Sequence, residues 1–371
     1  MESRVTSPAE PGGAASLRRR PRTDQVRDDT MTDAALYFTG PETVEVRETS
    51  VGPPEADELL VDTRASAISA GTELLVYRDQ TPGDLPADET LDALDGDLSY
   101  PLQYGYAASG VVRAVGADVD PDWVGRSVFS FVPHQTSFRT TPDAVVALAP
   151  ETTPAVGSLL PSVETATNIV LDAAPRLGER VVVFGAGVIG LCVTRLLAGF
   201  PLESLVVVDP VERRRTLAAA FGADRTTTPG TLDDAADAGV GSSDAALGDA
   251  DLAVELSGQP SALDDAIGVV GYDARIVVGS WYGTKREPIG LGGRFHRDRI
   301  DIVSSQVSTI SPELRGRWDR ERRMDAALER LDRVPADELI THRIPFERAA
   351  EAYELLDSES EEAVQVILEY S

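Results

Sequence analysis

A glycine-rich turn constrains this chain of 371 residues more than any other feature. Residues 181–184 are all apolar, without the alternation of a half-exposed strand, which predicts a strand buried on both faces of a parallel sheet. Gly185, Gly187 and Gly190 follow in the spacing GxGxxG. Gly185 allows a tight turn, Gly187 lets backbone amides approach a diphosphate, and Gly190 lets the next helix pack closely. The segment therefore predicts a dinucleotide site, although such turns also serve packing alone.

A second apolar run supports this interpretation. Residues 204–208 lead into Asp209, nineteen positions after Gly190. A carboxylate there can accept hydrogen bonds from the adenosine ribose and would repel the additional phosphate of NADP. We therefore expect NAD(H) as the cofactor, with Val188 and Ile189 of the turn among the residues that bind it.

Composition limits the partners. The formal net charge is -28 and acidic residues occur throughout, which argues against nucleic acid and membrane surfaces and is typical of a salt-adapted protein. Lys285 is the only lysine, and Cys192, the only cysteine, excludes a disulfide framework and is expected to be buried and inert. No apolar run approaches the ~20 residues of a membrane span. A cytoplasmic location is expected.

The order of elements predicts an α/β protein with two domains. Residues 1–30 are rich in Pro, Gly, Ser and Arg and are expected to be disordered. Residues 31–170 hold short strands separated by turns, which indicates a β-rich domain. Strands and helices alternate over 171–307, which predicts a doubly wound parallel sheet of the Rossmann type. Residues 308–371 end in a helix and a strand that we expect to return to the first domain.

Several motifs in this order resemble the medium-chain dehydrogenase/reductase family. RASAISAGTE at 64–73 is similar to the family segment RACGICGTD, and PLQYGYAASGVV at 101–112 resembles P-x-x-x-GHE-x-x-G-x-V. GRSVFSF at 125–131 and AAAFGAD at 218–224 resemble two further family segments. The resemblance covers about residues 34–371. It implies a GroES-like catalytic domain, a Rossmann cofactor domain and hydride transfer to or from a small molecule.

The metal ligands of zinc-containing members are missing at the matching positions. Ala70 stands where the family has a cysteine, or Ser69 if the alignment shifts by one residue. Tyr106 replaces the histidine of GHE, and Pro161 stands where polyol-dehydrogenase relatives have a ligating Glu. A catalytic zinc needs roughly three protein ligands. No zinc is therefore expected.

Without zinc, another group must stabilise the charge that develops on oxygen during hydride transfer. Thr72 keeps the hydroxyl that relays the proton in zinc-containing members and is the first candidate. The Tyr106 phenol is a second candidate, or it only packs. Glu164 begins an ETA triplet that, with the ISxGTE pattern, resembles a zinc-lacking subgroup including bacteriochlorophyllide hydroxyethyl dehydrogenases. It is a general base, an anchor near the nicotinamide, or a helix cap. Glu73 is expected to orient its loop.

Further residues are expected near the cofactor. The resemblance places Arg214 over the adenosine, and Ser257 and Gly279 follow successive predicted strands, at the edge where a dinucleotide crosses the sheet. Residues 294–299 contain His296 and three arginines. They bind an anionic group or form a salt-bridged surface turn.

These observations favour a zinc-independent, NAD(H)-dependent alcohol dehydrogenase or carbonyl reductase. A quinone or enone reductase is the alternative among enzymes, but zinc-free relatives of that kind often use NADPH, which Asp209 disfavours. A nucleotide-sensing protein without catalysis is the third hypothesis. A homodimer or homotetramer is expected, because Rossmann edge strands in the family commonly pair.

Overall fold

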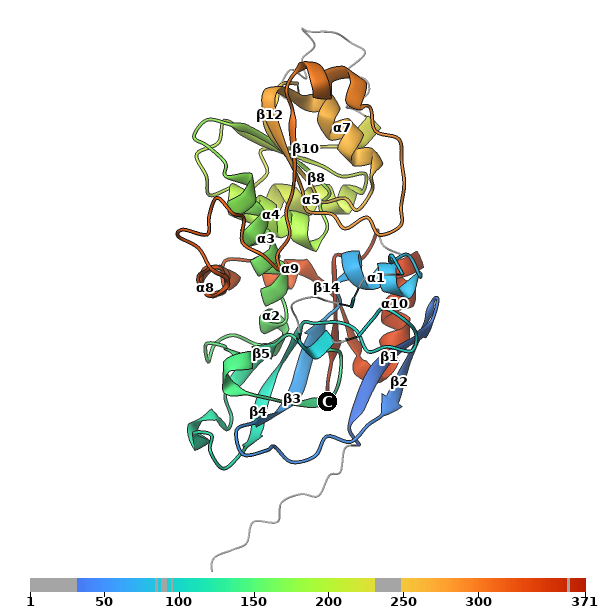
Figure 1. Cartoon of the computed structure of the whole chain (residues 1–371), viewed down its shortest axis with the longest axis vertical. Coiled ribbons are helices and arrows are strands. Elements are labelled where there is room, and N and C mark those ends of the chain that lie inside the picture. Colours follow the sequence, from blue (N-terminus) through green and yellow to red (C-terminus); the bar gives the residue numbers. More distant parts are fainter. Residues whose placement is uncertain (1–31, 84–85, 88–91, 95, 231–247, 359–360) are drawn as a thin grey trace, which may run out of the picture. The chain divides into compact units, whose positions relative to one another are not determined.

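The computed structural model of the chain is shown in Figure 1. It describes residues 32–83, 86–87, 92–94, 96–230, 248–358 and 361–371. The disorder expected for residues 1–30 lies outside the described residues. All contacts reported below lie within the unit Asp33–Ser371.

A parallel sheet forms the Rossmann domain. Within the described residues it has six strands in the order β10-β9-β8-β11-β12-β13, and every neighbouring pair is parallel. The strands are β8 (Arg180–Phe184), β9 (Ser204–Val208), β10 (Arg225–Thr227), β11 (Ala250–Glu255), β12 (Val270–Val278) and β13 (Asp301–Ser304). The strand order reverses between β8 and β11, and ligands of doubly wound sheets bind at such a point.

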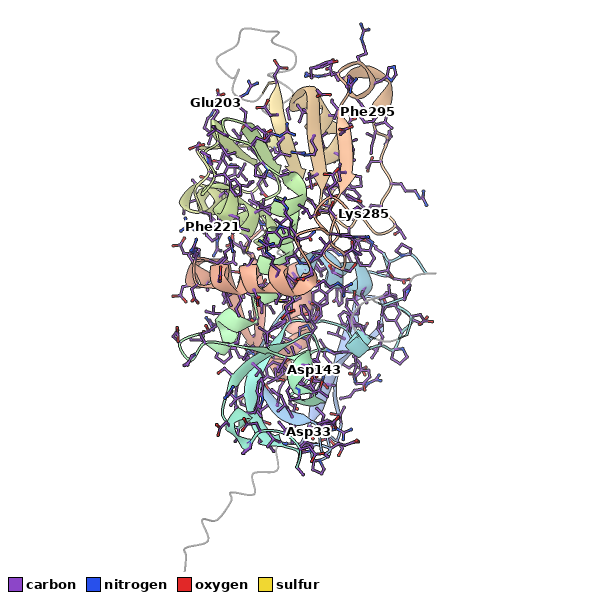
Figure 2. All side chains as sticks on the ribbon, turned by 60° about the vertical axis from the view of Figure 1, so that its left-hand side comes forward. Asp33, Asp143, Glu203, Phe221, Lys285 and Phe295 are labelled. Carbon is purple, nitrogen blue, oxygen red and sulfur yellow. The ribbon has the colours of Figure 1, made fainter. Side chains whose placement is uncertain are left out.

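The sheet is buried on both faces, as the apolar run 181–184 predicts. Val181 and Val183 pack into one apolar cluster, while Val182 and Phe184 pack into another. Helices cover the sheet: α3 (Leu160–Ala173), α4 (Val188–Leu197), α5 (Glu212–Ala220) and α7 (Ser261–Val269). Phe221, which follows α5 and is labelled in Figure 2, is fully buried in the first cluster.

Two helices connect the β-rich domain to β8. These are α2 (Pro154–Gly157) and α3, which begins at Leu160. Proline has no N–H to donate and is tolerated only in the first turn of a helix. Pro161 therefore occupies the first turn of α3, and a continuous helix through it is disfavoured.

The β-rich domain is built on a second sheet. Within the described residues its strand order is β14-β15-β3-β4-β5-β7, and β6 pairs with β3. The strands are β3 (Leu59–Ala67), β4 (Ala108–Val115), β5 (Ser127–Ser130), β6 (Ser137–Thr140), β7 (Val146–Ala147), β14 (Ile340–Pro345) and β15 (Gln365–Glu369). A hairpin of β1 (Ala34–Gly40) and β2 (Thr43–Glu48) precedes them. The C-terminal strand β15 pairs antiparallel with β3, so both ends of the described chain contribute to this domain.

The remaining helices are α1 (Ala70–Tyr77), α8 (Arg320–Leu331), α9 (Ala336–Leu339) and α10 (Ala349–Ser358). Helix α1 was not predicted, because its run LLVY suits a strand as well as a helix. In the described part of the chain, no helix has the length and apolarity needed to span a membrane.

Candidate functional site

The glycine turn joins β8 to α4. Gly185 has a φ of +93°, in the left-handed region that favours glycine. A Cβ on Gly190 would lie 1.9 Å from the carbonyl oxygen of Gly185, so only glycine allows α4 to approach the strand this closely. A Cβ on Gly187 would meet nothing within 4 Å, and no side chain caps α4 at this residue. Open space and unsatisfied N–H groups at the helix start fit a diphosphate.

Asp209 is tied to this turn. Its side chain is 3% exposed, and its Oδ2 accepts a hydrogen bond of 2.7 Å from the N–H of Ala186. Its Oδ1 accepts one of 2.8 Å from the N–H of Val211. Each carboxylate oxygen has a second lone pair, which leaves acceptor capacity for a ribose hydroxyl. A role in binding ribose stays a prediction.

The residues predicted to follow β11 and β12 lie at the same edge of the sheet as the glycine turn. Phe184, the last residue of β8, is in register with Glu255, and Glu255 is in register with Val278. Ser257 and Gly279 follow these two strand ends. A Cβ on Gly279 would come within 2.6 Å of the Leu256 side chain, so glycine serves packing there.

A buried carboxylate at this edge was not predicted. Glu255 is fully buried, and its Oε1 accepts a hydrogen bond of 2.7 Å from the N–H of Ser257. Its Oε2 accepts one of 2.6 Å from the Tyr282 hydroxyl. Burial, followed by the charge of Glu255, raises the pKa of Tyr282. The carboxylate thus fixes the segments that follow β11 and β12.

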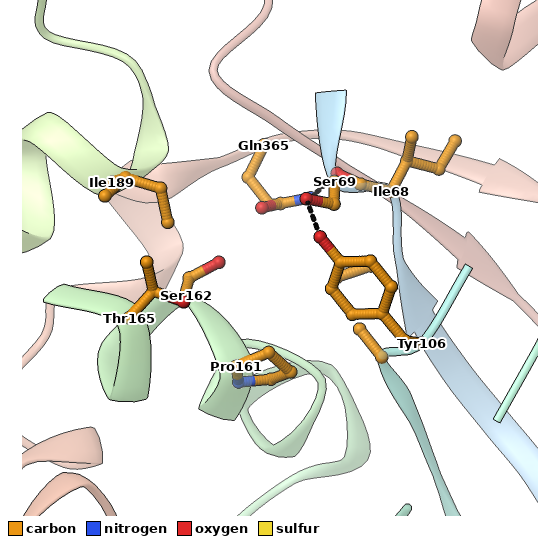
Figure 3. Close-up of a pocket in the computed structure, with 10 residues that line it drawn as sticks. Ile68, Ser69, Tyr106, Pro161, Ser162, Thr165, Ile189 and Gln365 are labelled. Carbon is orange, nitrogen blue, oxygen red and sulfur yellow. Dashed lines mark hydrogen bonds between the residues drawn. The ribbon is translucent and has the colours of Figure 1, made fainter. Parts of the chain in front are cut away.

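A small pocket lies between the β-rich domain and the start of α4 (Figure 3). Tyr106 and Ile189, both predicted site residues, line it together. The other lining residues are Ala67, Ile68, Ser69, Ala107, Pro161, Ser162, Thr165 and Gln365. The helix that follows the glycine turn therefore forms a wall of the same pocket as Tyr106.

Two hydroxyl groups face each other in this pocket. The Tyr106 hydroxyl donates a hydrogen bond of 2.6 Å to Oγ of Ser69 (Figure 3). Ala70 and Ser69 were the two candidates for the position of the family's cysteine. The Ser69 side chain contacts Tyr106, whereas Ala70 packs into an apolar cluster. Sequence reasoning had named Ser69 only as a replaced metal ligand, and the motif ISAGTE held no further signal for its role.

The side chains at this pocket do not fit a catalytic zinc ion. Ser69, Tyr106 and Pro161 all line it, and they supply hydroxyl groups and a ring without a donor atom. Zinc in proteins is held by thiolate, imidazole and carboxylate groups. Among the described residues, no group of three or more His, Cys, Asp or Glu side chains is arranged to hold a metal ion.

Thr72 lies outside the residues that line this pocket. It is partly exposed in the first turn of α1, and its N–H donates to the carbonyl oxygen of Ser69 over 2.9 Å. Its predicted catalytic role stays a prediction.

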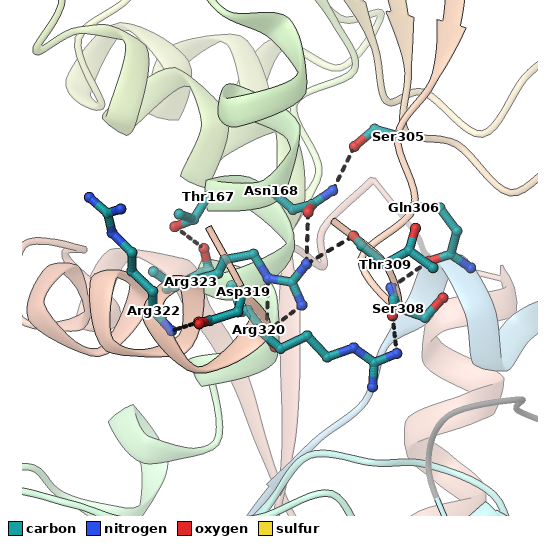
Figure 4. Close-up of polar contacts among 12 residues, drawn as sticks. Thr167, Asn168, Ser305, Gln306, Ser308, Thr309, Asp319, Arg320, Arg322 and Arg323 are labelled. Carbon is teal, nitrogen blue, oxygen red and sulfur yellow. Dashed lines mark hydrogen bonds and ion pairs between the residues drawn. The ribbon is translucent and has the colours of Figure 1, made fainter. Parts of the chain in front are cut away.

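Glu164 lies in a buried ion pair with Arg323 of α8, whose hydrogen bond to Asn168 is drawn in Figure 4. Its Oε1 accepts hydrogen bonds of 2.8 and 3.1 Å from the guanidinium, which also donates to Oδ1 of Asn168 over 2.8 Å. Burial raises the pKa of Glu164, and the charge of Arg323 opposes this shift. Because α3 begins at Leu160, Glu164 lies beyond its first turn and does not cap it. Oε1 of Glu164 accepts hydrogen bonds from the Arg323 guanidinium, which favours a structural role for Glu164 over the role of a general base.

The Glu73 side chain binds the backbone of Ser69. Its Oε1 accepts a hydrogen bond of 2.7 Å from the N–H of Ser69, and its Oε2 accepts one of 2.6 Å from the Tyr353 hydroxyl. His134 Nε2 lies 3.1 Å from the same Oε2, and its Nδ1 lies 2.6 Å from Oγ of Ser66. All of these side chains except that of Ser69 are buried. Glu73 thereby orients the segment that carries Ser69.

The structure gives the predicted basic residues other partners. Arg214 donates to the carbonyl oxygen of Ala363 over 3.0 Å and so ties α5 to the C-terminal segment. Its predicted place over the adenosine is untested. In the segment 294–299, Arg294 lies 3.3 Å from Asp298, and most of the segment is exposed. Of the two alternatives predicted for this segment, anion binding or a salt-bridged surface turn, the contacts match the surface turn.

Comparison with known proteins shows which proteins the chain is similar to. Residues 188–321 match the model of the zinc-binding dehydrogenase family. D-guloside 3-dehydrogenase of Escherichia coli (strain K12) is 26% identical over 331 residues, which cover 84% of this chain and 92% of that protein. These matches confirm the predicted resemblance to the medium-chain dehydrogenase/reductase family. Similarity to the zinc-lacking subgroup stays a prediction.

Solved structures establish the fold of the chain. A short chain alcohol dehydrogenase from Escherichia coli CFT073, complexed with NADH, superposes with a TM-score of 0.71 at 18% identity, over 91% of this chain and 99% of that one. 2R,3R-butanediol dehydrogenase from Bacillus subtilis gives a TM-score of 0.72 at 18% identity, with the same coverage. The predicted α/β fold, a GroES-like domain with a Rossmann domain, is confirmed.

Proposed function

We propose that this protein is a zinc-independent oxidoreductase that uses NAD(H) to interconvert an alcohol and a carbonyl by hydride transfer. The observation that carries this proposal is the shared pocket, in which Ile189 of the cofactor turn and the Ser69–Tyr106 hydroxyl pair meet. The names of relatives support the substrate class, because D-guloside 3-dehydrogenase and butanediol dehydrogenase act on hydroxyl compounds. The NADH complex of a relative with this fold supports a nicotinamide cofactor.

The hydroxyl pair supplies the acid that zinc supplies in other members. When bound, NAD(H) accepts or donates the hydride. Tyr106 donates a hydrogen bond to Oγ of Ser69, so the hydroxyl hydrogen of Ser69 is left to donate a hydrogen bond to the substrate oxygen. Hydrogen bonds in such a chain polarise one another, and an oriented donor stabilises the charge that develops on oxygen. Glu73 keeps Ser69 in place by accepting a hydrogen bond from its backbone N–H.

The cofactor preference rests on Asp209. Its carboxylate is held at the glycine turn by Ala186, where it would repel an additional phosphate on the adenosine ribose. NADH is therefore expected to bind more tightly than NADPH in a fluorescence titration. This argues against the enone-reductase alternative, which tighter binding of NADPH would favour. If NADH binds tightly and no substrate oxidises it, the protein is a nucleotide sensor instead.

Replacing Tyr106 by Phe tests the chemistry. The enzyme is assayed by NADH absorbance against alcohols, polyols, aldehydes and enones, and the best substrate is carried forward. Because removal of an oriented donor costs about 10²-fold or more in kcat, Tyr106→Phe is expected to lower kcat by about that factor. The matched control is Tyr272→Phe, since Tyr272 is 70% exposed. Equal kcat values for the two variants would contradict the assigned role of Tyr106.

We also propose a homodimer or homotetramer. Strand β13 is at the edge of the described sheet, where it pairs with β12 alone, and Val303 on it is 40% exposed. An uncovered edge strand can pair with a second copy. Light scattering is expected to give a mass of two or four chains. A monomer across the working concentration range would contradict this.

A further inference from the structure

The only lysine of the chain lies at the ligand-binding edge of the Rossmann sheet. Lys285, labelled in Figure 2, follows β12, and its Nζ donates a hydrogen bond of 2.7 Å to the carbonyl oxygen of Gly258. Gly258 comes directly after Ser257, and a Cβ on Gly185 would lie 2.7 Å from the Cα of Ser257. Lys285 is therefore held beside the ends of β8 and β11, the two strands between which the strand order reverses and where ligands of such sheets bind.

The ammonium of Lys285 has donor capacity left over. It carries three N–H groups, and the structure gives it one acceptor, the oxygen of Gly258. Glu255 acts on it from a distance, but both oxygens of this buried carboxylate already accept hydrogen bonds from Ser257 and Tyr282. Burial lowers the pKa of Lys285, and the positive charge of Arg78 lowers it further. A cation in this setting gains from an anionic ligand.

The negative net charge of the chain increases the contribution that a local cation makes to binding an anionic ligand. The chain carries 62 acidic and 34 basic residues, so its field repels a dinucleotide. All basic residues of the 34 other than Lys285 are arginine. Arginine presents a rigid planar fork, whereas an ammonium is a compact point charge with rotatable donors that binds a phosphate oxygen from several directions.

We propose that Lys285 binds the diphosphate of the dinucleotide from the side opposite the start of α4. The inference rests on the proposed function, because it requires that a nicotinamide dinucleotide binds at the glycine turn. The N–H groups at Gly187 and Val188 bind the diphosphate from one side, and the ammonium on Gly258 binds it from the other. The diphosphate is the ligand group assigned here, because it is the anionic part of every such cofactor and belongs at the glycine turn.

Because the chain has a single lysine, this side chain can be observed alone. Reductive methylation with ¹³C-formaldehyde labels Lys285 and the terminal amine and keeps both charges, and the Lys285→Arg variant assigns the two resonances. The dimethyl-Lys285 resonance is expected to shift with NADH and with ADP-ribose, which has the diphosphate without nicotinamide. It is expected not to shift with adenosine. An unchanged resonance at saturating NADH, or an equal shift with adenosine, would overturn the proposal.

Affinities of variants give a second test. Lys285→Met is expected to weaken binding of NADH and of ADP-ribose by roughly 10- to 100-fold, as for loss of a hydrogen bond to a charged group, while Lys285→Arg retains most of it. The matched control is Arg180→Met, the same loss of charge at the first residue of β8, the opposite end of the strand from Gly185. Thermal unfolding checks that the variants are folded.

The outcomes separate this inference from the proposed function. If the unmodified protein binds neither NADH nor ADP-ribose, the proposed function fails and this inference fails with it. If NADH binds the unmodified protein and Lys285→Met equally, only the role of Lys285 fails. If Arg180→Met weakens binding as much as Lys285→Met, the effect is one of net charge and the assignment is again overturned.

Discussion

The Tyr106 hydroxyl donates a hydrogen bond to Oγ of Ser69, and the proposed function uses the remaining hydrogen of Ser69 for a substrate oxygen. Tyr106 could be predicted, because the motif around it occupies consecutive positions. The partner of Glu164 could not, because Arg323 lies 159 residues further along the chain. A local pattern shows which residue stands at a position, but its hydrogen-bond partners depend on tertiary packing.

The thiol of Cys192 provides a residue-scale prediction. The side chain is 1% exposed, and burial raises its pKa from an ordinary 9.0 to about 12. The folded state keeps this proton to higher pH than the unfolded state does. The thiol therefore has no effect on the free energy of unfolding below about pH 9, and it lowers that free energy as pH rises toward about 12. The loss amounts to at most ~1.4 kcal/mol per pH unit.

Urea unfolding of the original protein and of Cys192→Ala, measured between pH 8 and about pH 11, tests this. The free energy of unfolding is expected to fall more steeply with pH in the original protein, because only that protein has the thiol. The folded protein is also expected not to react with a thiol reagent at neutral pH, while the unfolded protein reacts once per chain. Rapid reaction of the folded protein would show that the thiol is not buried.

At the scale of elements, strands were predicted better than helices. The strand that begins at Arg180 has consecutive apolar residues because both of its faces are buried, so its sequence alone defines it. The helix α1 has an apolar run whose conformation is decided by packing against the β-rich domain, and it was missed. The break between α2 and α3 comes just before a single proline, Pro161, in the first turn of α3.

The buried pair of Glu164 and Arg323 predicts how α3 and α8 are held together. Glu164→Gln is expected to lower the free energy of unfolding by ~3–5 kcal/mol, because it leaves the guanidinium buried without its counter-charge. Leu in place of Arg323 leaves the carboxylate unpaired and costs a similar amount. In the double variant the loss is expected to be smaller than the sum of the two, since neither charge is left alone.

An exposed ion pair of similar length serves as the control. Arg343 and Glu369 are 2.9 Å apart with side chains 43% and 48% exposed. Glu369→Gln is therefore expected to cost at most ~1 kcal/mol. Equal destabilisation by Glu164→Gln and Glu369→Gln would contradict a buried, stabilising contact between α3 and α8.

For the whole molecule, the order of elements along the chain predicted the two kinds of sheet, because long apolar runs and short alternating strands differ plainly in sequence. The pairing of β15 with β3 joins residues about 300 positions apart, such as Ile367 with Ala67. The return of this strand to the first domain was predicted, but its pairing with β3 was not, since nothing local in the C-terminal strand specifies its partner. The pocket is likewise formed from segments distant in sequence, which is why its members were predicted only in part.

The net charge of -28 predicts that salt stabilises the protein. The Debye length falls from about 10 Å at 0.1 M salt to about 3 Å at 1 M, so added salt weakens repulsion among the acidic side chains. The midpoint of thermal unfolding is expected to rise steadily between these concentrations of KCl. Sucrose at equal osmolality is the control for effects other than screening. A midpoint that does not change with KCl would show that the repulsion contributes little.

If hydroxyl groups, and not zinc, provide the acid for hydride transfer, turnover does not depend on a metal ion. The zinc content of catalytically active protein is measured after dialysis against a chelator, with turnover measured on the same sample. Zinc far below one ion per chain and unchanged turnover are expected. One tightly held zinc ion per chain, with turnover that is lost on its removal and restored by its return, would contradict this role of the hydroxyl groups.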